Sequence, residues 1–314
     1  MSRFVTVGGA QLGPIARSES RQIVISRLLE LMYEAAARGC DLVVFPELAL
    51  TTFFPRWWME DEVEIDAFFE REMPNAATAP LFEEAARRGI GFHLGYAELA
   101  TEGGATRHFN TAILVDKSGA IVGKYRKVHL PGHADDRSHF PFQHLEKRYF
   151  DVGDLGFETW RTLGGVMGMC ICNDRRWPET FRVMGLQGVE LVMLGYNTPS
   201  GNSLKPEESA ETRMHHSRLC MQAGAYQNAT WVVGVAKAGE EDGHHLIAGT
   251  CIIDPDGFVV TEAETEDDEL VVYDCDLDET KFLKETTFNF EAHRRVEHYR
   301  LIADRTGAKP PPED

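Results

Sequence analysis

Three residues whose side chains can share one acyl-transfer reaction each follow a strand-like run of the sequence: Glu47, Lys127 and Cys172. A carboxylate can accept a thiol proton and later activate water. A lysine can stabilise the negative oxygen that develops on an attacked carbonyl, and a thiolate can form the covalent intermediate. Together these side chains predict acyl transfer from a carbon–nitrogen bond to water.

Each of the three also has an ordinary structural interpretation. A carboxylate after a buried strand, such as Glu47, is as consistent with a cap for nearby loop backbone as with a site residue. A cysteine near a strand end is often a buried small side chain and nothing more. Ligands bind at strand ends in α/β proteins, however, so three complementary groups at three strand ends favour one shared site.

The segment Met167–Glu179 predicts a strand, a tight elbow at Cys172, and a helix that begins near Pro178. Arg175 and Arg176 follow the cysteine directly, and this electropositive setting is of the kind that lowers a thiol pKa. The neighbouring thiol Cys170 is expected to be an ordinary buried side chain.

The same two arginines predict a substrate that carries a carboxylate. A chain with a net charge of −18 must supply a local cation for such a substrate, and arginine binds carboxylates in a bidentate manner. Asn197 and Thr198, which end the next strand, are candidates to complete this clamp. The alternative for either arginine is a structural ion pair, for example with Asp174.

Strand-like and helix-like segments alternate in the middle of the chain, while hairpin-like pairs dominate both flanks, which predicts an α/β fold with a mixed sheet and helices on its outer faces. Helices are predicted at 19–38, 62–71, 79–88, 178–188 and 206–228. Strands are predicted at 4–10, 41–46, 90–99, 109–115, 121–128, 166–171, 189–194, 231–236, 247–253, 258–260 and 270–275. One domain over residues 1–304 and a polar, proline-rich tail over 305–314 are expected.

Composition narrows the class of protein. The net charge of −18 argues against a nucleic-acid partner, and no apolar run is long enough to span a membrane. The N-terminal sequence lacks the features of a secretory signal, so a cytoplasmic protein with six reduced cysteines is expected. The histidines of the long loop 129–154 fit no compact ligand motif, so neither a metal nor another cofactor is expected.

A loop dense in aromatic residues spans positions 53–58. Its side chains are interpreted as a packed loop anchor, with a pocket wall or a subunit contact as the functional alternatives.

The chain resembles the nitrilase superfamily in the segments around the three candidate residues, namely Phe45–Glu47, Lys124–Leu130 and Cys172–Glu179. Further segments are similar to the N-carbamoyl-D-amino acid amidohydrolase branch, namely Thr51–Trp57, Pro141–Phe150, Gly195–Pro199 and Phe288–Arg294. The acidic, proline-poor stretch Ser203–Ala210 departs from that branch, which leaves the side-chain preference of the substrate open.

The resemblance implies a four-layer αββα sandwich that self-associates as a homodimer or homotetramer, with the C-terminal segment crossing to the neighbour. It implies Glu47 as general base, Lys127 as oxyanion stabiliser, Cys172 as nucleophile and Glu146 as an additional glutamate that orients the lysine or the water. The reaction would convert an N-carbamoyl-D-amino acid to the D-amino acid, ammonia and carbon dioxide through an S-carbamoyl enzyme.

Four further residues are candidates to contact the ureido group or to order the loops, with ordinary structural hydrogen bonding as the competing interpretation: His129, His144, Asn173 and His215. Rival activities with the same three groups are β-ureidopropionase-like or aliphatic amidase hydrolysis and nitrile hydrolysis. A binding or assembly module without catalysis is the alternative from another class, and the intact set of glutamate, lysine and cysteine argues against it.

Overall fold

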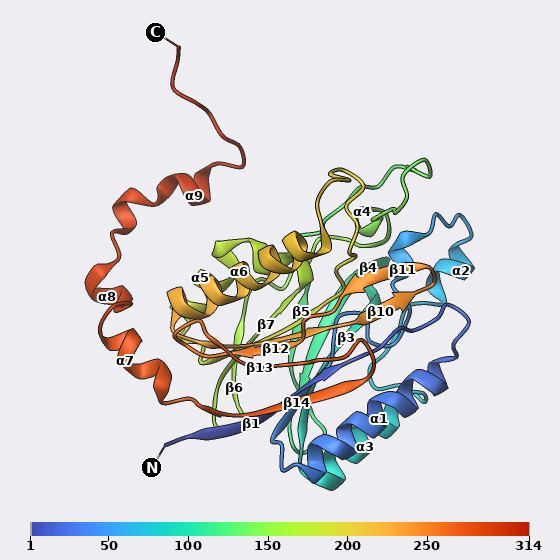
Figure 1. The fold of residues 1–314 in the computed structure, drawn as a ribbon, viewed down its shortest axis with the longest axis horizontal. Helices are drawn as coiled ribbons and strands as arrows, with labels where there is room; N and C mark the ends of the chain where they lie inside the picture. The colour runs from blue at the N-terminus through green and yellow to red at the C-terminus, as the bar shows by residue number, and fades with distance from the viewer. Residues whose placement is uncertain (1, 314) are drawn as a thin grey trace.

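The apolar runs of the sequence form two six-stranded β-sheets in the computed structural model, which describes residues 2–313 (Figure 1). The first sheet has the strand order β14 (Glu269–Asp276), β1 (Phe4–Gln11), β2 (Leu42–Val44), β3 (Gly91–Glu102), β4 (Ala105–Val115) and β5 (Ile121–Arg126). The second has the order β13 (Val259–Glu262), β12 (Cys251–Ile253), β9 (Trp231–Ala236), β8 (Leu191–Tyr196), β7 (Gly165–Ile171) and β6 (Thr159–Thr162). A separate hairpin pairs β10 (Ala238–Glu241) with β11 (His244–Ile247).

Both sheets are mixed, as the sequence predicts. Strands β1, β2 and β3 run parallel at the centre of the first sheet, and β7, β8 and β9 run parallel at the centre of the second. The flanking strands pair antiparallel with these central ones. The carboxyl ends of the parallel strands therefore gather at one edge of each sheet, which is where polar site residues are expected.

The two sheets pack face to face around the main core. Val7 and Val44 from the first sheet belong to the same buried cluster as Met169 and Val192 from the second. Strands buried on both faces read as near-continuous apolar runs, and this explains why 42–44 and 165–171 show no polar alternation.

Helices cover the outer face of each sheet (Figure 1). The first sheet carries α1 (Arg21–Ala37) and α3 (Ala79–Arg88), and the second carries α5 (Pro178–Leu186) and α6 (Ala210–Asn228). Helix α1 begins at Ser20, whose side chain accepts a hydrogen bond from the backbone of Ile23. Helix α3 ends at Gly89, which has a positive φ of 66° that glycine adopts at little cost. The predicted αββα arrangement of layers is confirmed.

Several predicted boundaries are wrong for identifiable reasons. The helix predicted at 62–71 stops early as α2 (Glu62–Asp66), because the chain then turns to form a parallel bridge between Glu70 and Glu98 of β3. The strand predicted at 247–253 is interrupted, because Ala248 and Gly249 both have positive φ. The helix predicted from 206 begins at Ala210, after its N-cap Ser209.

Some short elements were not predicted, although the three-residue strands β2 and β12 lie within predicted strands. Strands β6 and β10 have four residues each and carry no clear apolar period. Single-turn elements within the sandwich include η1 (Phe54–Arg56), α4 (Glu146–Tyr149) and η2 (Cys172–Arg176).

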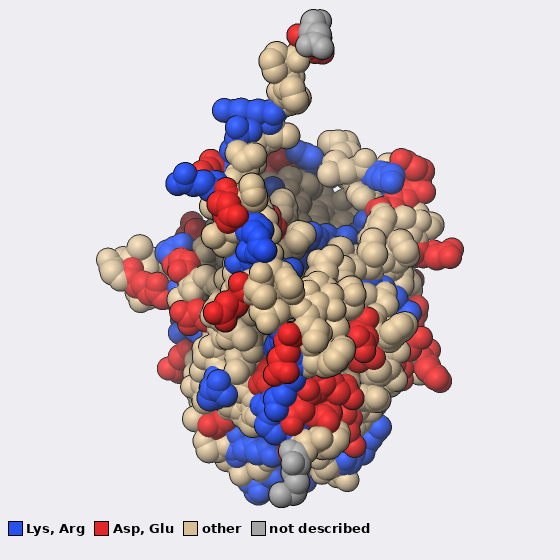
Figure 2. Space-filling view, turned by 90° about the vertical axis from the view of Figure 1, so that its left-hand side faces the viewer, with Lys and Arg blue, Asp and Glu red and all other residues tan. Residues whose placement is uncertain are grey.

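The C-terminal segment leaves the sandwich after β14 as a chain of short helices (Figure 1). They are α7 (Glu279–Glu285), α8 (Phe290–His293), η3 (Val296–His298) and α9 (Arg300–Asp304). Figure 1 shows this segment standing away from the sandwich, and Figure 2 shows the molecule from that side, with acidic and basic side chains interspersed and a hollow in its upper part. Within residues 2–313, no helix has the length and apolar character needed to cross a membrane.

Candidate active site

Of the three strand ends singled out in the sequence, two are in direct contact in the folded chain, and the third, Cys172, lies near enough to feel the charges of both. Lys127, just after β5, places its Nζ 2.7 Å from Oε1 of Glu47, which follows β2. The same Nζ lies 2.5 Å from Oε2 of Glu146, at the start of α4. All three side chains are fully buried.

The charges of this cluster reinforce one another. Burial alone would lower the pKa of Lys127, but the negative charges of Glu146 and Glu47 outweigh burial and raise it. Burial would likewise raise the pKa of Glu146, but the charge of Lys127 and a hydrogen bond from His144 outweigh it and lower that pKa. The lysine is therefore a fixed ammonium group between two carboxylates at neutral pH.

Polar neighbours hold the Glu47 carboxylate in one orientation. The side-chain amide of Asn110 donates to Oε1 at 2.8 Å, and the backbone N–H of Asn197 donates to Oε2 at 2.9 Å. The Asn197 side chain donates in turn to the backbone carbonyl of Glu47 at 2.9 Å. The carboxylate thus caps backbone, as one interpretation of the sequence held, and lies in the cluster as well.

Cys172 occupies the elbow between β7 and the one-turn helix η2. Its φ of 46° lies in the left-handed region, which costs a non-glycine residue energy and turns the side chain off the line of the strand. Its Sγ points at the backbone carbonyl of Asn197, 3.6 Å away. Cys170, two residues earlier, is fully buried in the core, as predicted.

The pKa of the Cys172 thiol is shifted in the direction opposite to the one that the sequence indicates. Burial raises the pKa of Cys172 to about 11, and the charge of Glu47 acts in the same direction. Lys127 and Arg175 lower it, but they do not overcome burial. The resting group is therefore a thiol, and forming a thiolate requires a base close by.

Asp174 fixes the elbow from beneath and does not pair with either arginine. Its carboxylate accepts hydrogen bonds from the hydroxyl of Tyr125 at 2.7 Å and from the backbone N–H groups of Ile171 and His129 at 3.1 and 2.9 Å. The ring Nδ1 of His129 lies 2.8 Å from the same carboxylate. A buried carboxylate so well supplied with donors is a structural anchor for the turn that carries Cys172.

Arg175 supports the elbow from the other side. Its guanidinium donates to the backbone carbonyl of Cys172 at 2.6 Å and to the hydroxyls of Thr198 and Ser217 at 3.0 and 3.1 Å, and it lies over the ring of Tyr196. The side chain is almost fully buried. Most of its donors therefore serve the protein itself.

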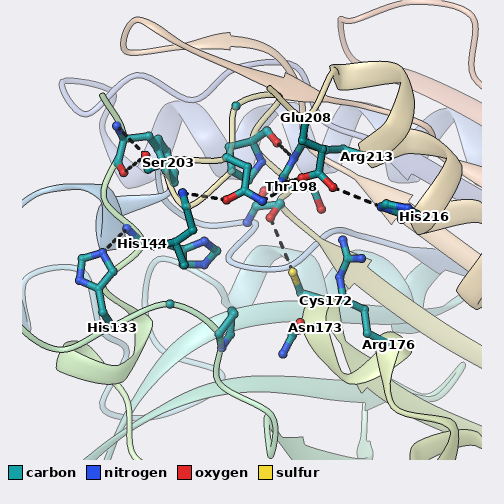
Figure 3. A pocket seen from close by; sticks show the side chains of 18 of the residues that line it. His133, His144, Cys172, Asn173, Arg176, Thr198, Ser203, Glu208, Arg213 and His216 are labelled. Carbon is teal, nitrogen blue, oxygen red and sulfur yellow. Dashed lines mark hydrogen bonds and ion pairs between the residues drawn. The ribbon is translucent and has the colours of Figure 1, made fainter. Parts of the chain in front are cut away.

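Arg176 has a different setting. Its side chain is exposed and, among residues 2–313, no carboxylate forms an ion pair with it. It extends alongside Cys172 into the space above the sulfur (Figure 3). Reduced hydration in this recess and the positive charge of Arg175 lower its pKa, so an incoming anion would relieve an unfavourable charge.

A cavity of about 280 Å³ opens above Cys172. The predicted substrate contacts that line it are Arg175, Arg176, Asn173, Asn197, Thr198 and His144. His144 bonds Glu146 at 2.8 Å and Asn197 bonds Glu47, so the buried cluster lies one residue behind the cavity wall.

Two histidines predicted at the site lie elsewhere. His215 is exposed on α6 and does not line the cavity; the next residue, His216, does, because one residue along a helix turns the side chain by about 100°. His129 is bonded to Asp174, stacks on Trp177 with ring centroids 4.8 Å apart, and borders a separate shallow recess. Neither histidine therefore lines the cavity above Cys172, and the contact of His129 with Asp174 agrees with its alternative role in ordering the loop.

The aromatic loop at 53–58 is a packed anchor. Phe53 and Phe54 are fully buried in a cluster with Tyr149 and Phe150, and no residue of this loop is among those lining the cavity. The interpretation as an anchor is therefore confirmed for these side chains.

Sequence reasoning missed Glu208 and Arg213, which line the cavity and pair with each other at 2.9 Å. The sequence carried little signal for this pair: positions 213 and 216 share one helix face, but nothing decided which face turns inward, and Glu208 precedes the helix. It also missed Asn110, whose contact with Glu47 spans two strands that no local pattern connects.

The folded chain belongs to the carbon–nitrogen hydrolase family, whose model matches residues 6–285. It is thus an enzyme of the nitrilase superfamily that hydrolyses amide-type carbon–nitrogen bonds.

Among its relatives, an N-carbamoylputrescine amidase from Arabidopsis thaliana is 29% identical over 288 residues, which cover 88% of this chain and 89% of the relative. A citrullinase from Francisella tularensis is 25% identical over 253 residues, 79% of this chain and 81% of the relative. The crystal structure of a carbon–nitrogen hydrolase from Helicobacter pylori superposes with a TM-score of 0.81 at 23% identity, covering 97% of this chain and 99% of that one. This last likeness concerns the fold.

Proposed function

We propose that the enzyme hydrolyses N-carbamoyl-D-amino acids to the D-amino acid, ammonia and carbon dioxide. The observation that carries the proposal is the charge of the cavity beside Cys172. Three arginines line it, Arg175, Arg176 and Arg213, and among the described residues Glu208 is the one carboxylate that does. Since Glu208 is already paired with Arg213, the balance favours a substrate with a negative charge.

The same charge balance argues against a cationic substrate such as N-carbamoylputrescine, on which the Arabidopsis relative is named to act. A terminal ammonium group would enter a site whose free cation is Arg176 and would find no unpaired carboxylate among the described lining residues. Like charges at close range cost free energy in a partly desolvated cavity. A carboxylate bound by Arg176, with Asn173 and Thr198 beside it, removes this conflict.

In the proposed mechanism, Cys172 attacks the carbonyl carbon of the carbamoyl group. Because its pKa of about 11 keeps it a thiol, the attack requires transfer of the thiol proton to Glu47. Lys127, held as an ammonium by Glu47 and Glu146, stabilises the negative oxygen of the tetrahedral intermediate.

Collapse of the intermediate releases the amino acid, whose nitrogen takes the proton back from Glu47, and leaves a carbamoyl group on the sulfur. Glu47 then activates water, which displaces the thiol and yields carbamate, the source of ammonia and carbon dioxide. Glu146 acts through Lys127, which it positions, and His144 in turn positions Glu146.

Preference for the D enantiomer rests on the resemblance of the sequence to the D-selective branch. A panel of N-carbamoyl-D-methionine, its L enantiomer, N-carbamoyl-β-alanine, a simple amide and an aromatic nitrile, with ammonia release as readout, tests both the class and the handedness. The proposal expects the D compound to be the best substrate. A better rate on N-carbamoyl-β-alanine, the simple amide or the nitrile would replace it with one of the rival activities.

The role of the nucleophile is tested by Cys172→Ala, which should lose turnover by about a thousandfold or more. Cys170→Ala is the matched control, because that thiol is fully buried in the core and has no place in the mechanism. Full hydrolysis by the Cys172→Ala protein would overturn the mechanism.

We also propose that the enzyme is a homodimer or homotetramer through its C-terminal segment. Phe282, Val296, Leu301 and Ile302 on this segment are exposed apolar side chains, which a second copy would cover. Light scattering of the whole chain and of a variant ending at 278 tests this, with a fall in mass of the variant expected and an unchanged mass contradicting it.

A further inference from the structure

Beyond the groups that bind the carbamoyl and carboxylate ends, the cavity contains a second charged cluster. Glu208, which precedes α6, pairs with Arg213 on the first turn of that helix at 2.9 Å and with His216 one turn later at 3.3 Å. All three side chains line the cavity that also holds Cys172 and Arg176 (Figure 3). The proposed mechanism uses none of them.

The cluster is tightly held. Asn202 donates to the carboxylate of Glu208 at 2.8 Å, and Arg213 also donates from its Nε to the backbone carbonyl of Pro199 at 2.7 Å. Hydrogen bonds from Asn202 and Arg213 lower the pKa of Glu208, so the carboxylate stays ionised. The side chains of Glu208 and Arg213 are only 8% and 13% exposed, so solvent screens their attraction little.

The loop that carries Glu208 is fixed to the opposite wall of the cavity. The hydroxyl of Ser203 donates to the carbonyl of Phe142 at 2.6 Å, and the N–H of Phe142 lies 3.3 Å from the same hydroxyl. One serine thus ties the 200–208 loop to the 131–144 loop. The ion pair of Glu208 is therefore part of a defined wall.

The size and chemistry of the cavity indicate where each part of the proposed substrate would lie. With the carbamoyl carbon at Cys172 and the carboxylate at Arg176, the side chain of the amino acid must occupy the rest of the space. The lining there includes the apolar side chains of Pro131, Phe140, Phe142 and Leu204, the ion pair of Glu208 and Arg213, and polar side chains such as His133, Asn202 and His216.

We propose that the Glu208–Arg213 pair selects uncharged amino acid side chains, because each member cancels the charge that the other would present to the substrate. This rests on the proposed function. Removing Glu208 leaves Arg213 as an unpaired cation facing the side chain, and removing Arg213 leaves Glu208 as an excess anion beside His216. A low-dielectric wall with one uncompensated charge attracts the opposite charge on a ligand strongly.

The test compares kcat/KM for two pairs of substrates that differ mainly in charge, in whichever enantiomer the wild-type enzyme hydrolyses. The pairs are N-carbamoyl-aspartate with N-carbamoyl-asparagine, and N-carbamoyl-lysine with N-carbamoyl-norleucine. Wild type should prefer the neutral member of each pair. Glu208→Gln should raise the aspartate-to-asparagine ratio by about tenfold or more.

Arg213→Gln should raise the lysine-to-norleucine ratio instead, by about tenfold or more, which keeps the proposal testable if one variant fails to fold. Glu207→Gln is the matched control: it removes the same charge one residue away, from an exposed side chain outside the cavity, and both ratios should stay at the wild-type values.

Ratios in Glu208→Gln and Arg213→Gln that remain within about threefold of wild type, while the neutral substrates are still hydrolysed, would overturn this inference alone. Failure of wild type to hydrolyse any of the four carbamoyl compounds would instead overturn the proposed function, and with it the inference.

Discussion

Glu47 and Asn197 hold each other across the two sheets by two hydrogen bonds, each 2.9 Å long. The backbone N–H of Asn197 donates to the Glu47 carboxylate, and the Asn197 side chain donates to the Glu47 backbone carbonyl. One residue follows β2 in the first sheet and the other follows β8 in the second. The proposed base is therefore positioned by the same contact that joins the two halves of the sandwich, and the carbonyl of Asn197 also faces the sulfur of Cys172.

Asn197→Ala tests this contact between the two sheets. It leaves the buried Glu47 carbonyl without its side-chain donor, which should lower the free energy of unfolding by about 1–3 kcal/mol. The backbone N–H of residue 197 still reaches the carboxylate, but without the side-chain bond the Glu47 backbone is held less firmly, so kcat should fall more than KM rises. Asn173→Ala, which lines the same cavity without touching Glu47, should keep more of the wild-type stability. Denaturant titration and steady-state kinetics measure both effects, and an unchanged kcat in Asn197→Ala would contradict the positioning role.

The raised thiol pKa predicts how the resting enzyme reacts with iodoacetamide. Burial favours the neutral thiol and raises the pKa of Cys172 to about 11, so the thiolate fraction is small at pH 7. Alkylation of Cys172 should then accelerate by about tenfold per pH unit through the range in which an ordinary thiol, with a pKa of about 8.5, has already levelled off. Peptide-level mass spectrometry separates it from the partly exposed Cys220. A plateau near pH 8.5 or below would contradict the account.

Glu47→Gln should change this reactivity in a counterintuitive direction. The negative charge of Glu47 raises the pKa of the Cys172 thiol, so its removal lowers that pKa and should speed alkylation at pH 8. The same change removes the base and should abolish turnover. Slower alkylation together with lost turnover would mean that Glu47 ionises the thiol in the resting state.

Arg176 and Arg175 should separate into binding and structural roles. Arg176→Gln removes an exposed cation without an ion-pair partner in the described chain, so stability should hardly change. A charged hydrogen bond to the substrate carboxylate is worth about 1.5–3 kcal/mol, so KM should rise by about tenfold or more. Arg176→Lys should be intermediate, because it keeps the charge and loses the bidentate geometry. An unchanged KM in Arg176→Gln would remove the carboxylate clamp.

Arg175→Gln should instead lower stability and kcat together. Its guanidinium holds the backbone carbonyl of Cys172 and the hydroxyls of Thr198 and Ser217, so its loss releases the elbow that carries the nucleophile. Thermal unfolding and kcat on one preparation measure the two effects. A rise in KM alone, with both stability and kcat retained, would assign this arginine to the substrate.

A second buried charge cluster supports the fold beneath the site. Glu241 pairs with Arg56 at 2.6 Å and with Lys237 at 2.9 Å, all without exposure. Glu241→Gln leaves two buried cations uncompensated and should cost about 3–5 kcal/mol of unfolding free energy, whereas Glu240→Gln on the exposed neighbour should cost little. Burial would raise the pKa of Glu241, but the charges of Lys237 and Arg56 outweigh it and lower that pKa.

The lowered pKa of Glu241 determines how the stability gained from its ion pairs depends on pH. The stabilisation by the Glu241 ion pairs is present above the unfolded-state pKa of glutamate, about 4.3. It is lost as the pH falls through the lower folded-state pKa. The difference in denaturation midpoint between wild type and Glu241→Gln should therefore be largest near neutral pH and shrink in strong acid. A difference that does not vary with pH would contradict the ionised pairing.

Most of what could be predicted about the site came from the types of residue at the ends of strands. Glu47, Lys127 and Cys172 end strand-like runs, and the near-continuous apolar runs before Glu47 and Cys172, which indicate strands buried on both faces, are visible in a single sequence. The hydrogen bonds from Asn110 and Asn197 that hold Glu47 in the site were not visible, because they depend on contacts between strands that are remote in the chain. The raised pKa of Cys172 was missed for a related reason: nearby arginines can be read from the sequence, but the depth of burial that outweighs them cannot.

The remaining differences at the site concern which residues of helix α6 face the cavity. His215 and His216 are adjacent, and no pattern in the sequence decided which one turns toward the cavity. Glu208 lies in the stretch Ser203–Ala210, where the chain departs from the branch it resembles, and Arg213 follows three residues later, so neither resemblance nor periodicity assigned the pair a place.

The central claim is that the site accepts a carbamoyl compound with a carboxylate and disfavours one with an ammonium group. The most direct measurement is kcat/KM of the wild-type enzyme for N-carbamoyl-D-methionine and for N-carbamoylputrescine under identical conditions. Because Arg176 is free to pair with the carboxylate and the one lining carboxylate, Glu208, is already paired, the account predicts a preference of about tenfold or more for the methionine compound. An equal or greater kcat/KM for N-carbamoylputrescine would contradict it.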